Sequence, residues 1–247
     1  MSDQPSNVPA LFPLGQDGIL VRFGDGRRAD PAAALAFGDA VRTAELPGVI
    51  EVATSLSSTL VRFAPPRIGR GDLAGRLREL LDGPHGVAST TPPHRLWTIP
   101  VSFGGDDGPQ LAEAATLAGR TVAQALDDLT GTELSVLAIG FAPGQPYIGH
   151  LPDAWDMPRQ SGLTPEVPAG ALVVALRQLV LFGNPSPTGW RWIGRCAFAP
   201  FRAERAEPFA LRAGDRIRFA STDADTIATL RENQSDGLGG ATCTEAG

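Results

Sequence analysis

The sequence has few cysteines and no long apolar run, and these two absences exclude several classes of protein. Only Cys196 and Cys243 occur among 247 residues, too few for a disulfide framework and without the spacing of a metal site. No stretch reaches the roughly 18 apolar residues of a membrane-spanning helix, so none is predicted. The start, MSDQPSNVPALFPLG, lacks a basic segment followed by an apolar core, so we predict no signal peptide and a cytoplasmic protein.

Basic patches and familiar catalytic signatures are also missing. The formal net charge is −6 and no block of lysine or arginine occurs, which argues against nucleic acid as a partner. Neither a GxSxG elbow, a GxxxxGKS/T loop, an HExxH pair nor a CxxC pair is present. The histidines are His85, His94 and His150, and we expect the first two to be solvated. No catalytic residue is therefore assigned, and no metal site is predicted.

Residues 1–84 have the pattern of a small α/β domain. GILVRFGD at 18–25 alternates apolar and polar residues as a half-buried strand does, and Asp30-Pro31 is a favourable helix start. Two strand-like runs and an amphipathic helix at 71–83 follow. Strand, helix, strand, strand, helix is the order of a ferredoxin-like unit. The segment 85–95, rich in proline, glycine, serine and threonine, is predicted to be a linker.

Residues 96–232 are predicted to form a second, β-rich domain, which makes the fold class α+β. Two helices, at 109–119 and 121–129, precede short apolar runs that alternate with glycine and proline turns. That alternation is typical of an antiparallel β-barrel or sandwich. The tail 233–247 contains too few apolar residues to pack, so we predict that it is disordered.

Three segments rich in glycine and proline lie close together in the sequence, at 140–152, 167–170 and 184–190. Glycine lets a backbone approach another group closely, and proline fixes the shape of a loop in advance. If these segments share one barrel rim, they can present backbone N–H groups to a ligand or a partner. Turns between barrel strands also require glycine and proline, and the sequence leaves both interpretations open.

Seven short motifs occur in a characteristic order: PLGQDGILVRFGD, LPGVIEV, IPVSFGGDDGPQL, GFAPGQPYIG, PR…VPAG, SPTGWRWIGR and GDRIRF. Over roughly residues 12–221 the chain resembles the family of allophanate hydrolase subunit 1, which also contains the B subunit of 5-oxoprolinase and the Kip inhibitor, a carboxyltransferase C/D-type domain. The resemblance implies a small α/β domain followed by a cyclophilin-like β-barrel.

The resemblance also implies partners and a cofactor. Family members act with a subunit-2 partner, and the pair resembles the carboxyltransferase portion of urea carboxylase, with a site where the two chains meet. A LamB/YcsF-type third component joins them for ATP-dependent opening of 5-oxoproline to glutamate, with ATP on this chain or on a partner. We therefore expect a heteromeric ATP-dependent amide or lactam hydrolase. One family branch inhibits a histidine kinase, so a non-catalytic regulatory binding protein is the alternative.

The candidate residues for substrate binding or for the subunit interface come from these motifs. They are Gly140, Phe141, Pro143, Gly144, Gln145, Tyr147, His150, Arg159, Gly170, Arg177, Gln178, Gly189, Trp190 and Arg195. Arg195 is expected either to contact a ligand or partner or to form a salt bridge across the barrel. Tyr147 is the only tyrosine, with ligand contact and packing both open. Trp190 is expected to pack in the core or an interface, and Cys196 to be buried rather than nucleophilic.

Several positions depart from the family's usual residues. These are Gln145, His150, Gln160, Thr164 and the turn 176–182, in which only Gln178 remains. Arginines are usual in place of Gln160 and Thr164, and neither residue replaces the fixed fork of donors that arginine offers to an anion. Arg177 adds a cation nearby. The sequence leaves open whether the substrate chemistry is altered or whether the family reaction is unchanged.

Overall fold

The chain forms two compact units, Met1–Pro92 and Pro93–Gly247. The computed structural model describes residues 9–24, 30–83, 95–233 and 236–245. His85, His94 and all of the predicted linker except Arg95 lie outside these residues.

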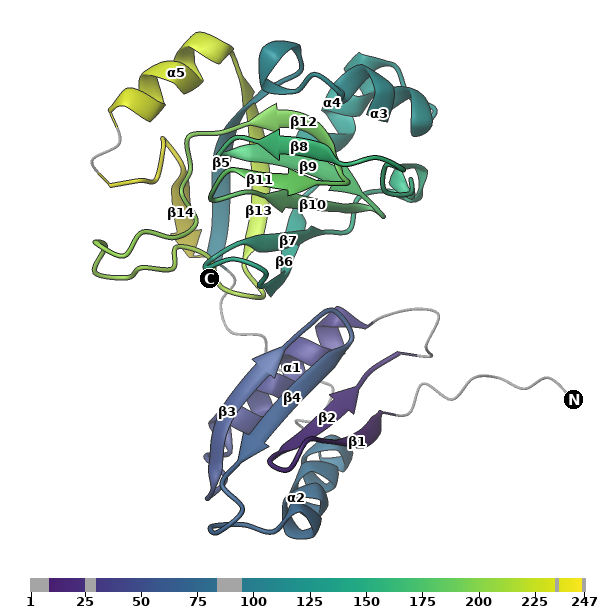
Figure 1. Cartoon of the computed structure of the whole chain (residues 1–247), viewed down its shortest axis with the longest axis vertical. Coiled ribbons are helices and arrows are strands. Elements are labelled where there is room, and N and C mark those ends of the chain that lie inside the picture. The colour runs from purple at the N-terminus through teal and green to yellow at the C-terminus, as the bar shows by residue number, and fades with distance from the viewer. Residues whose placement is uncertain (1–8, 25–29, 84–94, 234–235, 246–247) are drawn as a thin grey trace, which may run out of the picture. The chain divides into compact units, whose positions relative to one another are not determined.

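The N-terminal unit is a four-stranded antiparallel sheet with two helices (Figure 1). Its elements are β1 (Ala10–Leu14), β2 (Gly18–Arg22), α1 (Pro31–Thr43), β3 (Val49–Thr54), β4 (Ser58–Phe63) and α2 (Arg70–Asp82). The sheet order is β1-β2-β4-β3, so the predicted ferredoxin-like series is confirmed and gains an edge strand, β1. Asp30 caps α1 as predicted, because its Oδ1 accepts the N–H of Ala33 at 3.0 Å. Phe37, Phe63 and Leu73 are among the buried residues that form the core between the sheet and the helices.

The second unit contains the remaining elements. They are β5 (Arg95–Phe103), η1 (Gly105–Asp107), α3 (Leu111–Leu117), α4 (Val122–Gly131), β6 (Leu134–Ile139), β7 (Pro146–Gly149), η2 (Asp153–Trp155), β8 (Thr164–Val167), β9 (Ala171–Ala175), β10 (Gln178–Leu181), β11 (Ser186–Thr188), β12 (Arg191–Arg195), β13 (Arg216–Thr222), α5 (Ala224–Glu232) and β14 (Thr242–Glu245). The predicted α+β class is confirmed, and the helices expected at 109–119 and 121–129 correspond to α3 and α4.

Seven strands close into a barrel in the order β12-β9-β10-β7-β6-β13-β5 (Figure 1). Closure comes from the pairing of β12 with β5, where Gly194 lies opposite Phe103 and Arg195 opposite Ser102. Only glycine fits at 194, since a Cβ there would lie 2.8 Å from Val101 Cγ1 and 3.1 Å from the carbonyl oxygen of Ser102. The strand can therefore close the barrel because residue 194 has no side chain.

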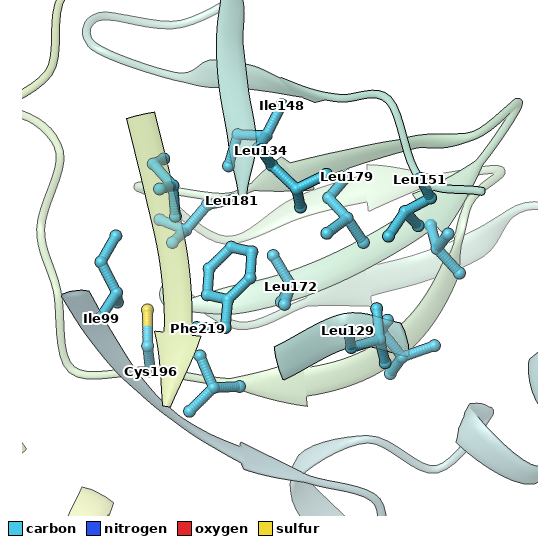
Figure 2. Close-up of a cluster of buried hydrophobic side chains, with 14 of the residues drawn as sticks. Ile99, Leu129, Leu134, Ile148, Leu151, Leu172, Leu179, Leu181, Cys196 and Phe219 are labelled. Atoms are coloured by element: carbon cyan, nitrogen blue, oxygen red, sulfur yellow. The ribbon is translucent and has the colours of Figure 1, made fainter. Parts of the chain in front are cut away.

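Apolar side chains fill the interior of this barrel. Figure 2 shows Leu134, Ile148, Leu172 and Phe219 pointing toward one another, with Leu129 of α4 beside them. All of these side chains have at most 1% of their surface exposed. A barrel of this size is just wide enough for side chains to fill it. A ligand site on this unit is therefore to be sought at the rim or on the outer face.

The outer face of the barrel is covered by the short pair of strands β8 and β11 (Figure 1). A second apolar cluster lies there, in which Val167 of β8 packs with Val173 of β9, Val180 of β10, Phe182 and Trp190. This layer explains why β9 is buried along its whole length: one set of its side chains faces the interior and the other faces the cover.

The C-terminal segment corrects the prediction of a disordered tail at 233–247. Thr242–Glu245 forms β14, which pairs antiparallel with the first half of β5, and α5 precedes it. The side chains of β14 are all exposed. A strand of this kind is held by backbone hydrogen bonds to an existing sheet edge, which an apolar count cannot detect. The prediction was therefore wrong for residues 242–245.

A buried ion pair fixes the start of β5 against the turn before β13. Arg95 donates Nε to Asp215 Oδ1 at 2.9 Å and Nη2 to Oδ2 at 2.6 Å, and Nη2 also donates to the carbonyl of Ala210. Asp215 Oδ2 accepts two further N–H groups, the indole of Trp97 at 3.2 Å and the backbone of Arg212 at 2.8 Å. The carboxylate is only 6% exposed and fully satisfied.

Candidate binding site at the barrel rim

The predicted site residues divide between the two ends of the barrel. Strands β12, β9, β10, β7 and β6 are antiparallel neighbours, so the end of one lies beside the start of the next. The loop 140–145, Gly170 and Arg195 therefore share one end, which we call the Arg195 rim. His150, Arg177, Gln178, Gly189 and Trp190 lie at or toward the opposite end.

The three glycine- and proline-rich segments therefore do not share a single rim, the condition under which they could form one surface. The segment 140–152 contains β7, and 184–190 contains β11. Each segment thus begins at one end of the barrel and finishes at the other. The sequence did not reveal this because strands of three or four residues are too short for a clear alternation of polar and apolar side chains.

At the Arg195 rim, the loop 140–145 is a closed turn with a fixed shape. The backbone N–H of Gly140 donates to the carbonyl of Gln145 at 3.0 Å. Gly144 has φ 72°, and a Cβ there would lie 2.9 Å from both Phe201 Cβ and the carbonyl oxygen of Pro200, so only glycine fits. Gln145 is 2% exposed. The loop is thus anchored against residues 200–201.

The tip of this loop presents an aromatic side chain to solvent beside the exposed Pro143. Phe141 is 78% exposed and has φ 74°, an unfavourable conformation for a residue with a side chain. Phe209 is 48% exposed and packs against Phe201 with the rings tilted and their centroids 5.0 Å apart. Each exposed aromatic side chain offers apolar surface that a partner chain could bury.

Arg195 is the cation of the same rim. Its side chain is 24% exposed, and its nearest acid is Asp107, with 3.9 Å between Nη1 and Oδ1. That distance is too long for a hydrogen bond. Nε is buried without a partner among the described residues. Burial lowers the pKa of Arg195, and the nearby charge of Arg231 lowers it further. A salt bridge across the barrel, one of the two expectations, is therefore weak at most.

Gly170 brings the backbone of the VPAG turn close to Arg195. Its carbonyl accepts the N–H of Cys196 at 2.9 Å, and its N–H donates to the carbonyl of Phe182 at 2.7 Å. With φ 85°, a Cβ at this position would lie 2.2 Å from the carbonyl oxygen of Cys196. Glycine is therefore required here for a close approach of two strands, as the sequence suggested for this turn.

Cys196 is not a nucleophile in this arrangement. It is completely buried in the barrel core (Figure 2), and burial raises the pKa of its thiol to about 12. Arg231 and Arg195 act in the opposite direction without overcoming burial. A thiolate is the reactive form of cysteine, so this thiol is inert near neutral pH. The expectation of a buried, non-nucleophilic residue is confirmed.

Tyr147, Arg159, Gly189 and Trp190 form the outer-face packing rather than part of the Arg195 rim. Trp190 is 7% exposed and makes an edge contact with the ring of Tyr147 at 6.3 Å. The guanidinium of Arg159 lies over Trp190, 5.5 Å from the ring centroid. The carbonyl of Gly189 accepts the N–H of Gln160 at 2.7 Å. The packing interpretation of Trp190 is confirmed.

Gln160, which stands where the family usually has an arginine, belongs to a structural amide network. Its Nε2 donates to the carbonyl of Trp190 at 2.9 Å, and its Oε1 accepts from Gln110 Nε2 at 2.7 Å. Gln110 Oε1 in turn accepts the N–H of Trp192 at 2.9 Å. The amide therefore ties the segment before β8 to β12 and α3, and it is not directed toward the Arg195 rim.

At the opposite end, Arg177 is engaged in local contacts. Leu176 and Arg177 form the β9–β10 turn with φ 53° and 61°. Arg177 Nε donates to the carbonyl of Leu151 at 2.8 Å, and Nη1 pairs with Asp153 Oδ1 at 2.5 Å. His150 lies nearby; partial burial and then the charge of Arg177 lower its pKa. Arg177 is thus held by local contacts away from the Arg195 rim, and Gln178 lies opposite Gly149 in the β7–β10 pairing.

Two residues of the Arg195 rim were not identified from the sequence, namely Asp107 and Arg231. Asp107 follows β5, and Arg231 lies in the last turn of α5. Both are distant from Arg195 in sequence; Asp107 lies in the motif IPVSFGGDDGPQL without being singled out there, and Arg231 belongs to no motif. In the described residues no group of three His, Cys, Asp or Glu side chains could hold a metal, and no helix is long and apolar enough to cross a membrane.

Residues 9–211 match the family described as carboxyltransferase domain, subdomain C and D, and the chain belongs to this family. The expectation from the ordered motifs is confirmed. A relative from Bacillus subtilis (strain 168), named as the B subunit of 5-oxoprolinase, is 28% identical over 240 residues. The match covers 90% of this chain and 96% of the relative.

Two solved structures that resemble the chain are much longer proteins. TTHA0988 is 32% identical with a TM-score of 0.68 over 83% of this chain, which spans 40% of that protein. The urea amidolyase of Kluyveromyces lactis shares the fold, with 14% identity and a TM-score of 0.75 over 99% of this chain, which spans 17% of it.

Proposed function

We propose that the chain is the B-type component of a multi-component hydrolase that opens 5-oxoproline or a related lactam or amide, in the cytoplasm. The observation that carries this proposal is the match to 96% of the length of a protein named as the B subunit of 5-oxoprolinase. ATP hydrolysis would supply the free energy for opening an unstrained lactam, with the nucleotide on this chain or on a partner. The role of this chain is to bind and position the substrate at the Arg195 rim.

The partner in this proposal is a subunit-2 chain, joined by a LamB/YcsF-type third component. The exposed Phe141 and Phe209 support a protein contact at the same rim, because an aromatic group is costly to leave in water. The strained backbone at Phe141 supports it as well, since strained positions cluster at functional sites. A chain docked there would lie over Arg195 and complete a shared site.

The test is co-expression with candidate subunit-2 and LamB/YcsF-type chains, followed by size-exclusion chromatography with light scattering and an assay of glutamate formed from 5-oxoproline and ATP. We expect co-elution and turnover. A matched pair of variants locates the interface: Phe141→Asn at the Arg195 rim and Leu176→Asn at the opposite end. Both residues are exposed and have positive φ, which asparagine tolerates. Only Phe141→Asn should disrupt co-elution; equal effects of the two variants would contradict the proposed interface.

A regulatory binding protein is the second candidate. It is favoured by the use of Gln160 and Arg177 in internal contacts, because neither position then supplies the charge that arginines usually supply in the family. A chain that remains monomeric beside the candidate partner chains, or a stable complex that turns over none of 5-oxoproline, allophanate and urea derivatives, would support this second function and overturn the first.

A further inference from the structure

Arg195 carries a donor that nothing in the described structure satisfies. A guanidinium offers five N–H donors, and the buried Nε of Arg195 has no hydrogen-bond partner. A buried donor without a partner is costly. The side chain is nevertheless open to solvent over 24% of its surface, so a small group can reach it from the rim.

A second guanidinium increases the positive charge beside Arg195. Arg231 donates Nη1 to the carbonyl of Ala169 at 2.9 Å, in the turn next to Gly170. Its charge acts directly on Arg195. Asp107 is the carboxylate whose charge acts on Arg195 in the opposite direction, and it lies 3.9 Å away. Two cations therefore face one distant carboxylate, which leaves an excess of positive charge at the rim.

We propose that Arg195, with Arg231 beside it, binds a carboxylate or phosphate group of the substrate at the Arg195 rim. The two terminal nitrogens can donate to two oxygens of one planar carboxylate or of one phosphate, a bidentate arrangement for which a guanidinium is suited. Arg231 adds electrostatic attraction while it keeps its bond to Ala169. This inference rests on the proposed function in that it assigns the substrate's anionic group to the rim of the same site.

Binding measured without turnover separates this inference from the proposed function. The assembled complex, without ATP, is titrated calorimetrically with 5-oxoproline, with inorganic phosphate and with 2-pyrrolidone, the same ring without the carboxylate. Arg195→Gln removes the charge, and Arg195→Lys keeps it without the fork. Arg218→Gln is the control, since Arg218 is half-exposed and pairs with Glu133.

We expect Arg195→Gln to lower the affinity for the anion at least about tenfold and Arg195→Lys to lower it less. Arg218→Gln should change this affinity less than about twofold. If 5-oxoproline depends on Arg195 and phosphate does not bind, the site recognises the substrate carboxylate. The reverse result assigns a phosphate group. Binding of 2-pyrrolidone should not depend on Arg195 in either case.

Anion affinity that is the same in Arg195→Gln as in the unchanged protein overturns the inference, even if the complex is an active hydrolase. If the Arg195→Gln chain no longer co-elutes with its partners but still binds the anion by itself, the inference is also overturned, and Arg195 is assigned to the partner contact. Conversely, the complex could show no lactam turnover and yet bind the anion, with that binding lost in Arg195→Gln. This result supports the anion site and contradicts the proposed function. If no complex forms, the same phosphate titration of the isolated chain decides.

Discussion

Arg95 and Arg195 lie in the same barrel unit with similar exposure, 17% and 24%, yet only Arg95 has a carboxylate within hydrogen-bond distance. Arg95 makes three hydrogen bonds, two of them to Asp215. Burial alone would lower its pKa, but the hydrogen bond and charge of Asp215 outweigh burial and raise it. Arg195 has a carboxylate only at 3.9 Å, and its pKa is lowered.

The difference separates an arginine that holds the fold from one that is available to a ligand. Asp215 accepts hydrogen bonds from Arg95, from the indole of Trp97 and from the backbone of Arg212, so this ion pair requires no further hydrogen-bond partner. At Arg195 the fold leaves an N–H group and a charge without compensation from the described residues. Desolvating a charge without pairing it costs free energy, and proteins bear that cost mainly at functional sites.

The largest expected effect is on stability, at the satisfied pair. Asp215→Asn removes the charge that balances Arg95 and should lower the free energy of unfolding by about 3–5 kcal/mol. Urea denaturation followed by fluorescence measures this change. Glu133→Gln is the matched control, because Glu133 pairs with the half-exposed Arg216 and Arg218 and should contribute at most about 1 kcal/mol. Similar losses in the two variants would show that the buried pair is not special.

Much of the fold followed from local pattern. Asp30 and Pro31 predicted the start of α1, and the glycine and proline turns after Glu133 predicted a β-barrel or sandwich, of which the structure shows the barrel. β14 and β1 were missed, because an edge strand is held by backbone bonds and need not show a buried face. β14 also depends on a neighbour distant in sequence, β5, which a window of adjacent residues does not contain, whereas β1 forms a hairpin with the adjacent β2.

The candidate site was only partly predictable. Motifs identified Arg195 and Gly170, which the barrel brings to one rim. The glycine- and proline-rich segments also contain His150 and Trp190, which lie at the other end because the short strands β7 and β11 carry the chain there. Arg231 could not be found, since its effect on Arg195 arises only when α5 folds back beside the VPAG turn.

Replacing the unsatisfied arginine should have little effect on stability. Arg195→Gln, measured without any anion in low-phosphate buffer, should change the free energy of unfolding by less than about 0.5 kcal/mol or raise it. The reason is that the variant removes a partly desolvated charge without breaking a short hydrogen bond. Arg95→Gln should be clearly destabilised in the same assay. If Arg195→Gln loses as much as Arg95→Gln, Arg195 is structural and the comparison fails.

The smallest effect concerns Arg177, whose 31% exposure lies above that of both other arginines and whose partner, Asp153, is largely exposed. Partial burial and then the charge of Arg177 lower the pKa of His150. The neutral imidazole is therefore favoured in the folded state, and the stability it contributes is present above the unfolded pKa of about 6.5 and lost as the pH falls through the folded pKa. Arg177→Asn should raise the pKa of His150 toward its ordinary value and so reduce the amount of stability that is lost at acidic pH.

An NMR titration of the three histidines, with His150 assigned by His150→Gln, measures the midpoint of this protonation. Arg212→Gln is the control for removing an exposed charge elsewhere, since Arg212 pairs with Glu207 at the surface. A midpoint unchanged in Arg177→Asn would mean that Asp153 already cancels the charge of Arg177 at this distance. An arginine paired with a carboxylate would then leave the pKa of a neighbouring group unchanged, in contrast to Arg231, whose charge lowers the pKa of Arg195.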